Sequence, residues 1–442
     1  MGQIGKRLSS SQIIILGFAA VILLGSLLLI LPFATKDGHG AVFTDALFTA
    51  TSAVCVTGLV VQDTATYWSA FGHAVILTLI QIGGMGVVTV AIAISTFSGK
   101  QISLKQRSTM QEAISAHKVG GIVRLTGFII KMTILFELLG ALVMAPTFCK
   151  EFGFFKGVWY AIFHSISAFC NAGFDLMGVK SEYSSLTYFI ANPVINSAVI
   201  ALIIIGGIGF LTWEDIKTNK HHIRRYRMQS KVILTTTALL ILFPALYFFF
   251  FEFGNKPLGE RVWSSLFQAV TPRTAGFNTA DLTQISEAGS LLTIMLMLIG
   301  GSPGSTAGGM KTTTLAVMLS TAVSVFRRRE HTHFFGRRIN DDTVRNAATV
   351  FMMYLVLFLT GGFVISRVEG LPLLTCLYET ASAIGTVGLT LGITPDLGIV
   401  SQIILIFLMY IGRVGGLTLI FSTVFGNRGN TARLPQEKLT VG

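Results

Sequence analysis

The chain has 442 residues, of which 52% are hydrophobic and only 12% are charged, and its mean hydropathy is +0.69. Soluble globular proteins carry about a quarter charged residues, so this composition excludes an ordinary soluble domain. Apolar runs such as residues 13–33 and 194–211 approach or exceed the ~18–20 residues that cross the hydrocarbon core of a bilayer. The sequence therefore predicts a polytopic membrane protein.

The net charge of +12 comes largely from basic loops at 100–131, 217–231 and 327–345, with shorter basic sets at both termini. The loops between them carry Lys beside Asp or Glu. This is the positive-inside pattern, which predicts a multi-pass protein of the cell membrane with both termini in the cytoplasm and argues against a nucleic-acid partner. The first apolar run is longer than a signal-peptide core, so we expect it to be retained as a membrane helix.

A short motif recurs four times, with its glycine at Gly58, Gly173, Gly276 and Gly388, spaced 115, 103 and 112 residues apart. Before each motif lies an apolar segment that is too short to span the bilayer, and this length predicts a re-entrant half-helix. Longer apolar segments flank each of these units. The half-helices are predicted at 43–53, 156–169, 260–270 and 371–383, and the flanking segments at 12–33 and 69–96, 122–148 and 188–213, 230–253 and 288–326, 344–367 and 398–425.

This pattern predicts an all-α polytopic membrane protein with eight transmembrane helices and four re-entrant pore helices. Its four covalently joined membrane-pore-membrane repeats would surround one ion pore with pseudo-fourfold symmetry. Irregular backbone at membrane depth is tolerated where protein buries it or where it lines a water-filled path, which favours loops that converge on the pore. The repeats are predicted at 1–98, 99–217, 218–328 and 329–425, with a short cytoplasmic C-terminal tail at 426–442.

The four glycine loops have the composition of a cation filter. Potassium filters replace the water shell of the ion with backbone carbonyl oxygens, and glycine permits the positive φ that such loops need. No ring of Asp or Glu accompanies the loops. The predicted ion-binding residues, whose carbonyls would hold K⁺, are Val56, Thr57, Gly58, Asn171, Ala172, Gly173, Thr274, Ala275, Gly276, Thr386, Val387 and Gly388.

A second glycine motif follows each loop, at 83–86, 206–209, 300–304 and 412–415. Glycines in membrane helices commonly allow close helix packing. Recurrence in all four units argues against coincidence, but the sequence leaves open whether these glycines serve packing or function.

The sequence resembles the pore-forming subunits of the Trk/Ktr/HKT cation-transport superfamily, and most closely the bacterial Ktr branch. The resemblance covers nearly the whole chain and rests on Asn-Ala-Gly-Phe at 171–174, Arg-Thr-Ala-Gly-Phe-Asn at 273–278, Gly-Thr-Val-Gly-Leu-Thr at 385–390 and Ile-Gly-Arg-Val-Gly at 411–415. It implies potassium uptake, a homodimer and a cytosolic nucleotide-binding regulatory ring. No cofactor is expected on this chain, and a nucleotide is expected on the partner subunit only.

The third unit carries a run of Gly, Ser and Thr at 300–314 that has low helix propensity and contains Pro303. In the family the matching stretch is an intramembrane loop that gates the pore, whereas a kinked helix is the alternative. Lys311 and Arg413 are the charges nearest this stretch, and charges inside a membrane are functional candidates. The predicted gating residues are Gly300, Gly301, Ser302, Gly304, Ser305, Thr306, Gly308, Gly309, Lys311 and Arg413.

Three other polar residues of the pore regions are interpreted as structural. His164 and Glu379 lie nine residues before their glycines, on equivalent half-helices, and are expected to hydrogen-bond nearby loops rather than bind ions. Arg273 is expected to hydrogen-bond the third loop from behind.

Three other functions stay open. A sodium-selective or sodium-coupled transporter of the same superfamily would have a similar sequence, although glycine in all four loops favours potassium. A polytopic membrane enzyme is less well supported, since the chain has no HExxH, GxSxG or paired-carboxylate arrangement. A secondary carrier with inverted repeats would have halves of opposite topology, whereas all four units here start on the same side.

Overall fold

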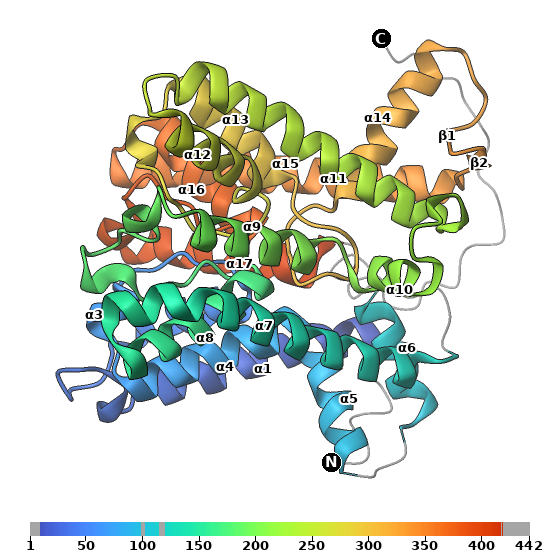
Figure 1. Ribbon diagram of the computed structural model, residues 1–442. Helices are drawn as coiled ribbons and strands as arrows, with labels where there is room; N and C mark the ends of the chain where they lie inside the picture. Colours follow the sequence, from blue (N-terminus) through green and yellow to red (C-terminus); the bar gives the residue numbers. More distant parts are fainter. Residues whose placement is uncertain (1–8, 99–101, 115–119, 417, 419–442) are drawn as a thin grey trace.

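The computed structural model describes residues 9–98, 102–114, 120–416 and 418, and the predicted tail at 426–442 lies outside them. The described chain is helical except for one small hairpin, in which β1 (His333–Phe334) pairs with β2 (Arg337–Arg338). Figure 1 shows the helices running side by side along one direction, with α5, α6, α10 and the hairpin gathered at the same end.

Four helices of the described chain are long and apolar enough to cross a membrane, and each opens one of the predicted units. The first starts with a capping box, in which Ser9 and Gln12 satisfy each other's backbone N–H groups. The fourth is capped by Asn340 and starts with two acidic residues, which suit a helix N-terminus. The four are α1 (Ser10–Leu29), α7 (Ile122–Phe152), α11 (Met228–Tyr247, continued by a π turn at Phe248–Glu252) and α15 (Asp341–Glu369).

Four shorter helices fall where the half-helices are predicted. They run from an exposed start to a fully buried C-terminal turn, as in the first, where Ala53 and Val54 are buried and Phe43 is exposed. The chain leaves each of them through a glycine motif instead of continuing as a span. They are α2 (Phe43–Val54), α8 (Phe154–Cys170), α12 (Leu258–Val270) and α16 (Leu373–Gly385).

Three of the four returning segments are not straight, which their sequences did not predict in this detail. Two of them bend, by 94° at Gly86 and by 96° near Gly209, and both glycines have positive φ. The third is interrupted by a loop at 299–311, which agrees with the predicted loop rather than with a kinked helix. The returning helices are α4 (Ala70–Met85) and α5 (Val87–Phe97), α9 (Pro193–Gly207) and α10 (Phe210–Asn219), α13 (Glu287–Leu298) and α14 (Thr312–Phe326), and α17 (Ile399–Val414).

Short elements complete the connections. The helix α6 (Leu104–Ala113) follows the first unit and packs against α1. The others are the four-residue α3 (Thr64–Tyr67) and 3₁₀ turns at Pro32–Ala34, Met177–Val179, Thr187–Phe189, Ile223–Arg225, Leu282–Gln284 and Thr394–Asp396.

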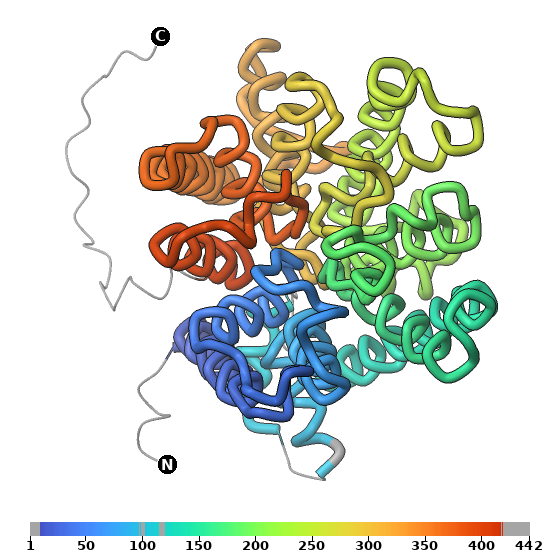
Figure 2. Tube along the Cα trace, turned by 90° about the vertical axis from the view of Figure 1, so that its left-hand side faces the viewer, coloured from blue at the N-terminus to red at the C-terminus, as the bar shows by residue number. Residues whose placement is uncertain are grey.

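The four units surround one centre. Figure 2 shows the chain passing around it in sequence order, from blue through green and yellow to red, so that the last unit lies beside the first. A direct contact between α17 and α2 closes this circle. The short helices point inward and contribute much of the core, including Phe48, Phe163, Phe267 and Tyr378, which are all essentially unexposed.

The close approach of α7 to its pore helix α8 generates a prediction about stability. A β-carbon on Gly157 would lie 2.5 Å from the backbone nitrogen of Cys149, so Gly157→Ala should lower the free energy of unfolding by about 1–3 kcal/mol. Gly127 on α7 is the matched control, since a β-carbon there meets nothing within 4 Å. Gly127→Ala should be neutral or stabilising by up to about 1 kcal/mol. Thermal unfolding of both variants in detergent tests the pair, and equal midpoints would contradict this packing.

Candidate functional site

The four glycines of the recurring motif form a closed ring, here called the glycine ring (Gly58, Gly173, Gly276 and Gly388). A β-carbon on each would lie under 3.0 Å from the carbonyl oxygen that precedes the glycine of the next unit. The order runs from the first unit to the fourth and back to the first, through the carbonyls of Ala172, Ala275, Val387 and Thr57. The loops therefore meet at one axis, and only glycine fits at the contact.

The backbone of the four loops has the same conformation. In each loop the glycine and the residue two before it have positive φ, while the residue between them does not. This alternation of handedness turns successive carbonyl groups towards the same side of the chain, as a set of cation ligands requires. The residues two before the glycines are Val56, Asn171, Thr274 and Thr386, with φ of 50°, 58°, 74° and 51°.

Hydroxyl groups near the C-terminal ends of the pore helices hold these loops in place. Ser52 accepts a 3.0 Å hydrogen bond from the Gly58 N–H, and Ser382 accepts one of the same length from Gly388. In the second and third units the hydroxyl is instead the donor, to the carbonyl oxygen of the Phe that follows the glycine. Each loop is thus bonded to the end of its own helix.

The interpretation of His164 and Glu379 as loop-bracing residues is confirmed. His164 Nδ1 donates to the Tyr160 carbonyl at 2.7 Å, and its Nε2 accepts from the Leu176 N–H at 3.3 Å. The Glu379 carboxylate accepts from the hydroxyls of Thr390 and Thr394, the latter at 3.1 Å. Both side chains are fully buried and hold the chain just after their glycines.

The expectation for Arg273 is wrong. Its guanidinium donates to Thr237 Oγ1 on α11 at 3.4 Å, and its Nε has no partner among the described residues. The side chain leaves the ring because it points to the outer helix, a direction that spacing along the sequence does not reveal. The cysteines are free, and no group of three metal-ligating side chains occurs in the described part of the chain.

Several buried oxygens at the ring have no hydrogen-bond partner among the residues that the structure describes. They are the side-chain oxygens Thr57 Oγ1, Asn171 Oδ1, Thr274 Oγ1 and Thr386 Oγ1. A buried polar atom without a partner costs free energy, so binding an ion or a water would stabilise these oxygens. A hydroxyl or amide oxygen is a good ligand for a cation. The donor set therefore fits a cation at the axis.

The α13–α14 loop (residues 299–311) lies against this ring. A β-carbon on Gly308 would overlap the Thr386 side chain, and one on Gly300 would lie 3.1 Å from the Thr274 methyl group. The Thr306 hydroxyl accepts from the Asn171 side-chain amide at 3.1 Å and donates to the Phe169 carbonyl at 3.0 Å. The loop thus packs directly against one side of the ring.

The second glycine motifs supply the acceptors that hold this loop. Ser302 donates its N–H to the Gly207 carbonyl at 2.9 Å, Thr306 donates to Gly206 at 3.2 Å, and Gly309 donates to Gly412 at 3.2 Å. A helix that ends or bends leaves its last carbonyls without intrahelical partners. The breaks in α9 and α17 therefore present free carbonyls to the loop, a role that no sequence signal beyond the recurrence itself could have revealed.

Arg413 fastens the loop to the first unit. Its Nη1 donates to the Thr306 carbonyl, and its Nη2 donates to the carbonyls of Gly83 at 2.5 Å and Gly84 at 3.1 Å. Lys311 turns back to its own loop and donates to the carbonyls of Ala307 at 2.8 Å and Gly308 at 3.2 Å. Neither cation forms an ion pair with a described carboxylate.

The sequence from residue 9 to residue 428 matches the family model TrkH, described as cation transport protein. The chain belongs to this family. It is 41% identical to the potassium/sodium uptake protein NtpJ of Enterococcus hirae, over all of this chain and 99% of that protein. It is 38% identical to the Ktr system potassium uptake protein B of Bacillus subtilis, over 99% of this chain and 97% of the relative.

The TrkH family also shares this fold. The solved structure of the potassium transporter TrkH from Vibrio parahaemolyticus superposes with a TM-score of 0.74, at 20% identity, over 93% of this chain and 84% of that one. The predicted fold class and the resemblance to the Trk/Ktr superfamily are confirmed. The chain is a multi-pass membrane protein of a cation-transporter family, and not an enzyme.

The bonding of the loops to the pore helices predicts an effect on stability. Ser382→Ala leaves the buried Gly388 N–H without its acceptor, which should lower the free energy of unfolding by about 1–3 kcal/mol. Ser197, exposed on α9, is the control, because its hydroxyl bonds only within the helix. A thermal midpoint for Ser382→Ala that equals that of Ser197→Ala would show that the hydroxyl does not hold the loop.

Proposed function

We propose that this chain takes up potassium ions across the cell membrane through the glycine ring. The observation that carries the proposal is the closure of the ring, in which each of the four loops meets the carbonyl of the next. A ring of carbonyls in alternating backbone conformation can replace the hydration shell of an ion. We assign the ion-binding role to the residues at 56–58, 171–173, 274–276 and 386–388.

The surroundings of the ring favour a cation over an anion. The four pore helices end beside the ring, so the partly negative C-terminal ends of their dipoles point towards the ion. The side-chain oxygens of Thr57, Asn171, Thr274 and Thr386 add polar atoms without other partners. The two described cations nearest the axis, Lys311 and Arg413, are held by loop carbonyls.

Sodium is the second candidate cargo. It is supported by the 41% identical relative, whose name gives both potassium and sodium uptake. Glycine at all four ring positions favours the larger, more weakly hydrated potassium ion, because unhindered carbonyls can spread to match it. Uptake of each ion in a transport-deficient host distinguishes the two. Sodium coupling would make potassium uptake depend on external sodium.

The α13–α14 loop is proposed to be the gate. It lies against the ring and is held by carbonyl acceptors of the second and fourth units and by Arg413, which also bonds to the first unit, so releasing these bonds would open the path. We assign gating to the residues predicted from the sequence, which are Gly300, Gly301, Ser302, Gly304, Ser305, Thr306, Gly308, Gly309, Lys311 and Arg413.

The orientation and partners complete the proposal. The basic loops support a cytoplasmic location for both termini and for the end of the molecule that carries α5, α6 and α10. We propose a homodimer in which a cytosolic nucleotide-binding subunit regulates the gate. The names of the Ktr relatives, which describe them as parts of a system, support a further subunit, whereas the homodimer and the nucleotide rest on the resemblance to the Ktr branch. The repeat boundaries at 98/99, 217/218, 328/329 and 425/426 are part of this proposal.

The ring predicts a change in ion preference. Gly388→Ser places a side chain against the Thr57 carbonyl and strains a backbone with φ of 97°, so potassium should lose its advantage over sodium by about tenfold or more. Competition uptake of the two ions measures the ratio. Gly392→Ser is the matched control, since Gly392 has a similar φ of 95° but meets nothing within 4 Å. Equal selectivity in both variants would contradict the assignment of the ring.

The gate predicts an increase in flux. Arg413→Gln removes the hydrogen bonds that Arg413 donates to Thr306 of the loop and to Gly83 and Gly84 of the first unit, and a deletion within 300–309 shortens the loop itself. Both changes should therefore raise potassium flux several-fold in the absence of a partner. Arg367→Gln, at the exposed end of α15, controls for loss of a positive charge. Liposome flux that falls in folded Arg413→Gln protein would exclude a closing role for this residue.

A further inference from the structure

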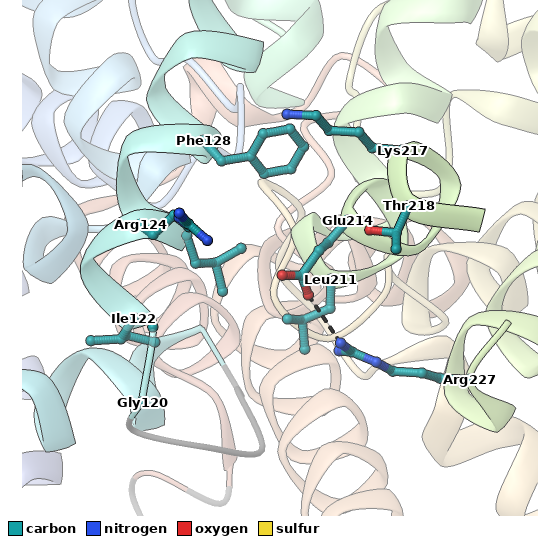
Figure 3. Close-up of a pocket in the computed structure, with 11 residues that line it drawn as sticks. Gly120, Ile122, Arg124, Phe128, Leu211, Glu214, Lys217, Thr218 and Arg227 are labelled. Atoms are coloured by element: carbon teal, nitrogen blue, oxygen red, sulfur yellow. Dashed lines mark hydrogen bonds and ion pairs between the residues drawn. The ribbon is translucent and has the colours of Figure 1, made fainter. Parts of the chain in front are cut away.

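A cavity of about 730 Å³ lies between the first turns of α7, the helix α10 and the start of α11. It shares no lining residue with the glycine ring or the α13–α14 loop. Figure 3 shows Arg124 and Phe128 on the α7 wall, with Glu214 and Lys217 on the opposite wall. Because Arg124 lies in the first turn of the α7 span, the cavity is at the cytoplasmic edge of the membrane in the orientation proposed above.

The charges in this cavity leave an excess of positive groups. Glu214 pairs with Arg227 at 3.2 Å, and Arg227 also lies 3.5 Å from Asp215, so this one cation and two carboxylates leave a single negative charge, which is less than the charge of the two remaining cations. Arg124 and Lys217 are exposed and form no ion pair with a described residue. Two cations thus face the cavity without a partner carboxylate.

The start of α7 adds backbone donors to the same place. Its N-cap, Gly121, is left-handed with φ of 79°, no side chain caps the helix, and no acidic residue lies in its first turn. A β-carbon on Gly120 or Gly121 would meet no atom of the described residues within 4 Å, so the described part of the chain leaves this helix end open to a ligand. Uncapped N–H groups at a helix N-terminus favour anions, and phosphate groups in particular.

Apart from Thr218, the remaining side chains of the lining are apolar and lead towards the hydrocarbon region. Leu125, Phe128 and Leu211 line the cavity, and the Lys217 ammonium lies 4.7 Å from the centre of the Phe128 ring. From there α7 continues with large apolar side chains exposed to the membrane, such as Leu138 and Leu142. A free phosphate ion would gain nothing from this apolar path, whereas acyl chains would follow it.

We propose that this cavity binds the phosphate headgroup of an anionic phospholipid of the inner leaflet. Arg124, Lys217 and the first N–H groups of α7 hold the phosphate, and Leu125, Phe128 and Leu211 contact the first methylene groups. Basic pockets between membrane helices on the cytoplasmic side recognise lipid headgroups in this way. The proposal rests on the orientation proposed above, and not on which ion passes the ring.

Native mass spectrometry of the full chain in detergent, with added phosphatidylglycerol or phosphatidylcholine, tests the proposal. The wild-type protein should retain phosphatidylglycerol in preference to phosphatidylcholine. Arg124→Gln combined with Lys217→Gln should weaken phosphatidylglycerol binding about tenfold or more, because each charged donor to a phosphate contributes on that scale. Thr218→Glu, which adds a negative charge at the exposed rim, should weaken it as well.

The matched control is Arg327→Gln combined with Arg328→Gln, which removes the same charge from two exposed residues after α14. Its phosphatidylglycerol binding should equal that of the wild type. Equal binding by the Arg124/Lys217 variant and the wild type would overturn the site. Displacement of the lipid by millimolar inorganic phosphate would overturn the lipid assignment in favour of a free anion. Binding is measured without an ion gradient, so either failure is distinct from a failure of the transport proposal.

Discussion

The meeting of four loops at one axis is the constraint on which the rest of the structure depends. Each glycine of the ring faces a carbonyl of the next unit at a distance that leaves no room for a side chain. The pore helices are short enough to end at the axis. Hydroxyl groups in their buried C-terminal turns then hold the glycine loops there. The long outer helices shield these polar loops from lipid, since exposed backbone groups are not tolerated in hydrocarbon.

The broken helices solve a second problem at the same depth. A loop such as residues 299–311 exposes many N–H and carbonyl groups in the middle of the membrane, and each needs a partner. The bends and ends of the returning helices free the carbonyls that satisfy the loop, and Arg413 bridges loop and first unit with bonds to backbone oxygens only. The same breaks thus stabilise the loop and attach it through hydrogen bonds, which can break and re-form.

Much of the fold follows from sequence periodicity, whereas the contacts between units do not. The four half-helices and the loop of the third unit were predictable because recurrence, length and low helix propensity act within a single segment. The 94° bend at Gly86 and the anchoring of the loop by Gly206, Gly207 and Gly412 depend on segments far apart in the chain. Arg273 shows the same limit, because position along a loop does not reveal that its side chain points to Thr237. The cavity beside Arg124 likewise arises only when α7 meets α10.

The circular order of contacts in the glycine ring has a consequence for how the chain can change. The four units differ in sequence and are joined in one polypeptide, so each loop can be substituted separately. Each ring glycine nevertheless lies against a carbonyl oxygen of the next unit and so affects the position of that oxygen. A displacement of one loop is therefore expected to displace the next loop, and so on around the ring. Substitutions in adjacent quadrants are expected to act non-additively, whatever their separation in sequence. In the proposed filter role, ion preference would therefore depend on all four loops together and not on any single loop.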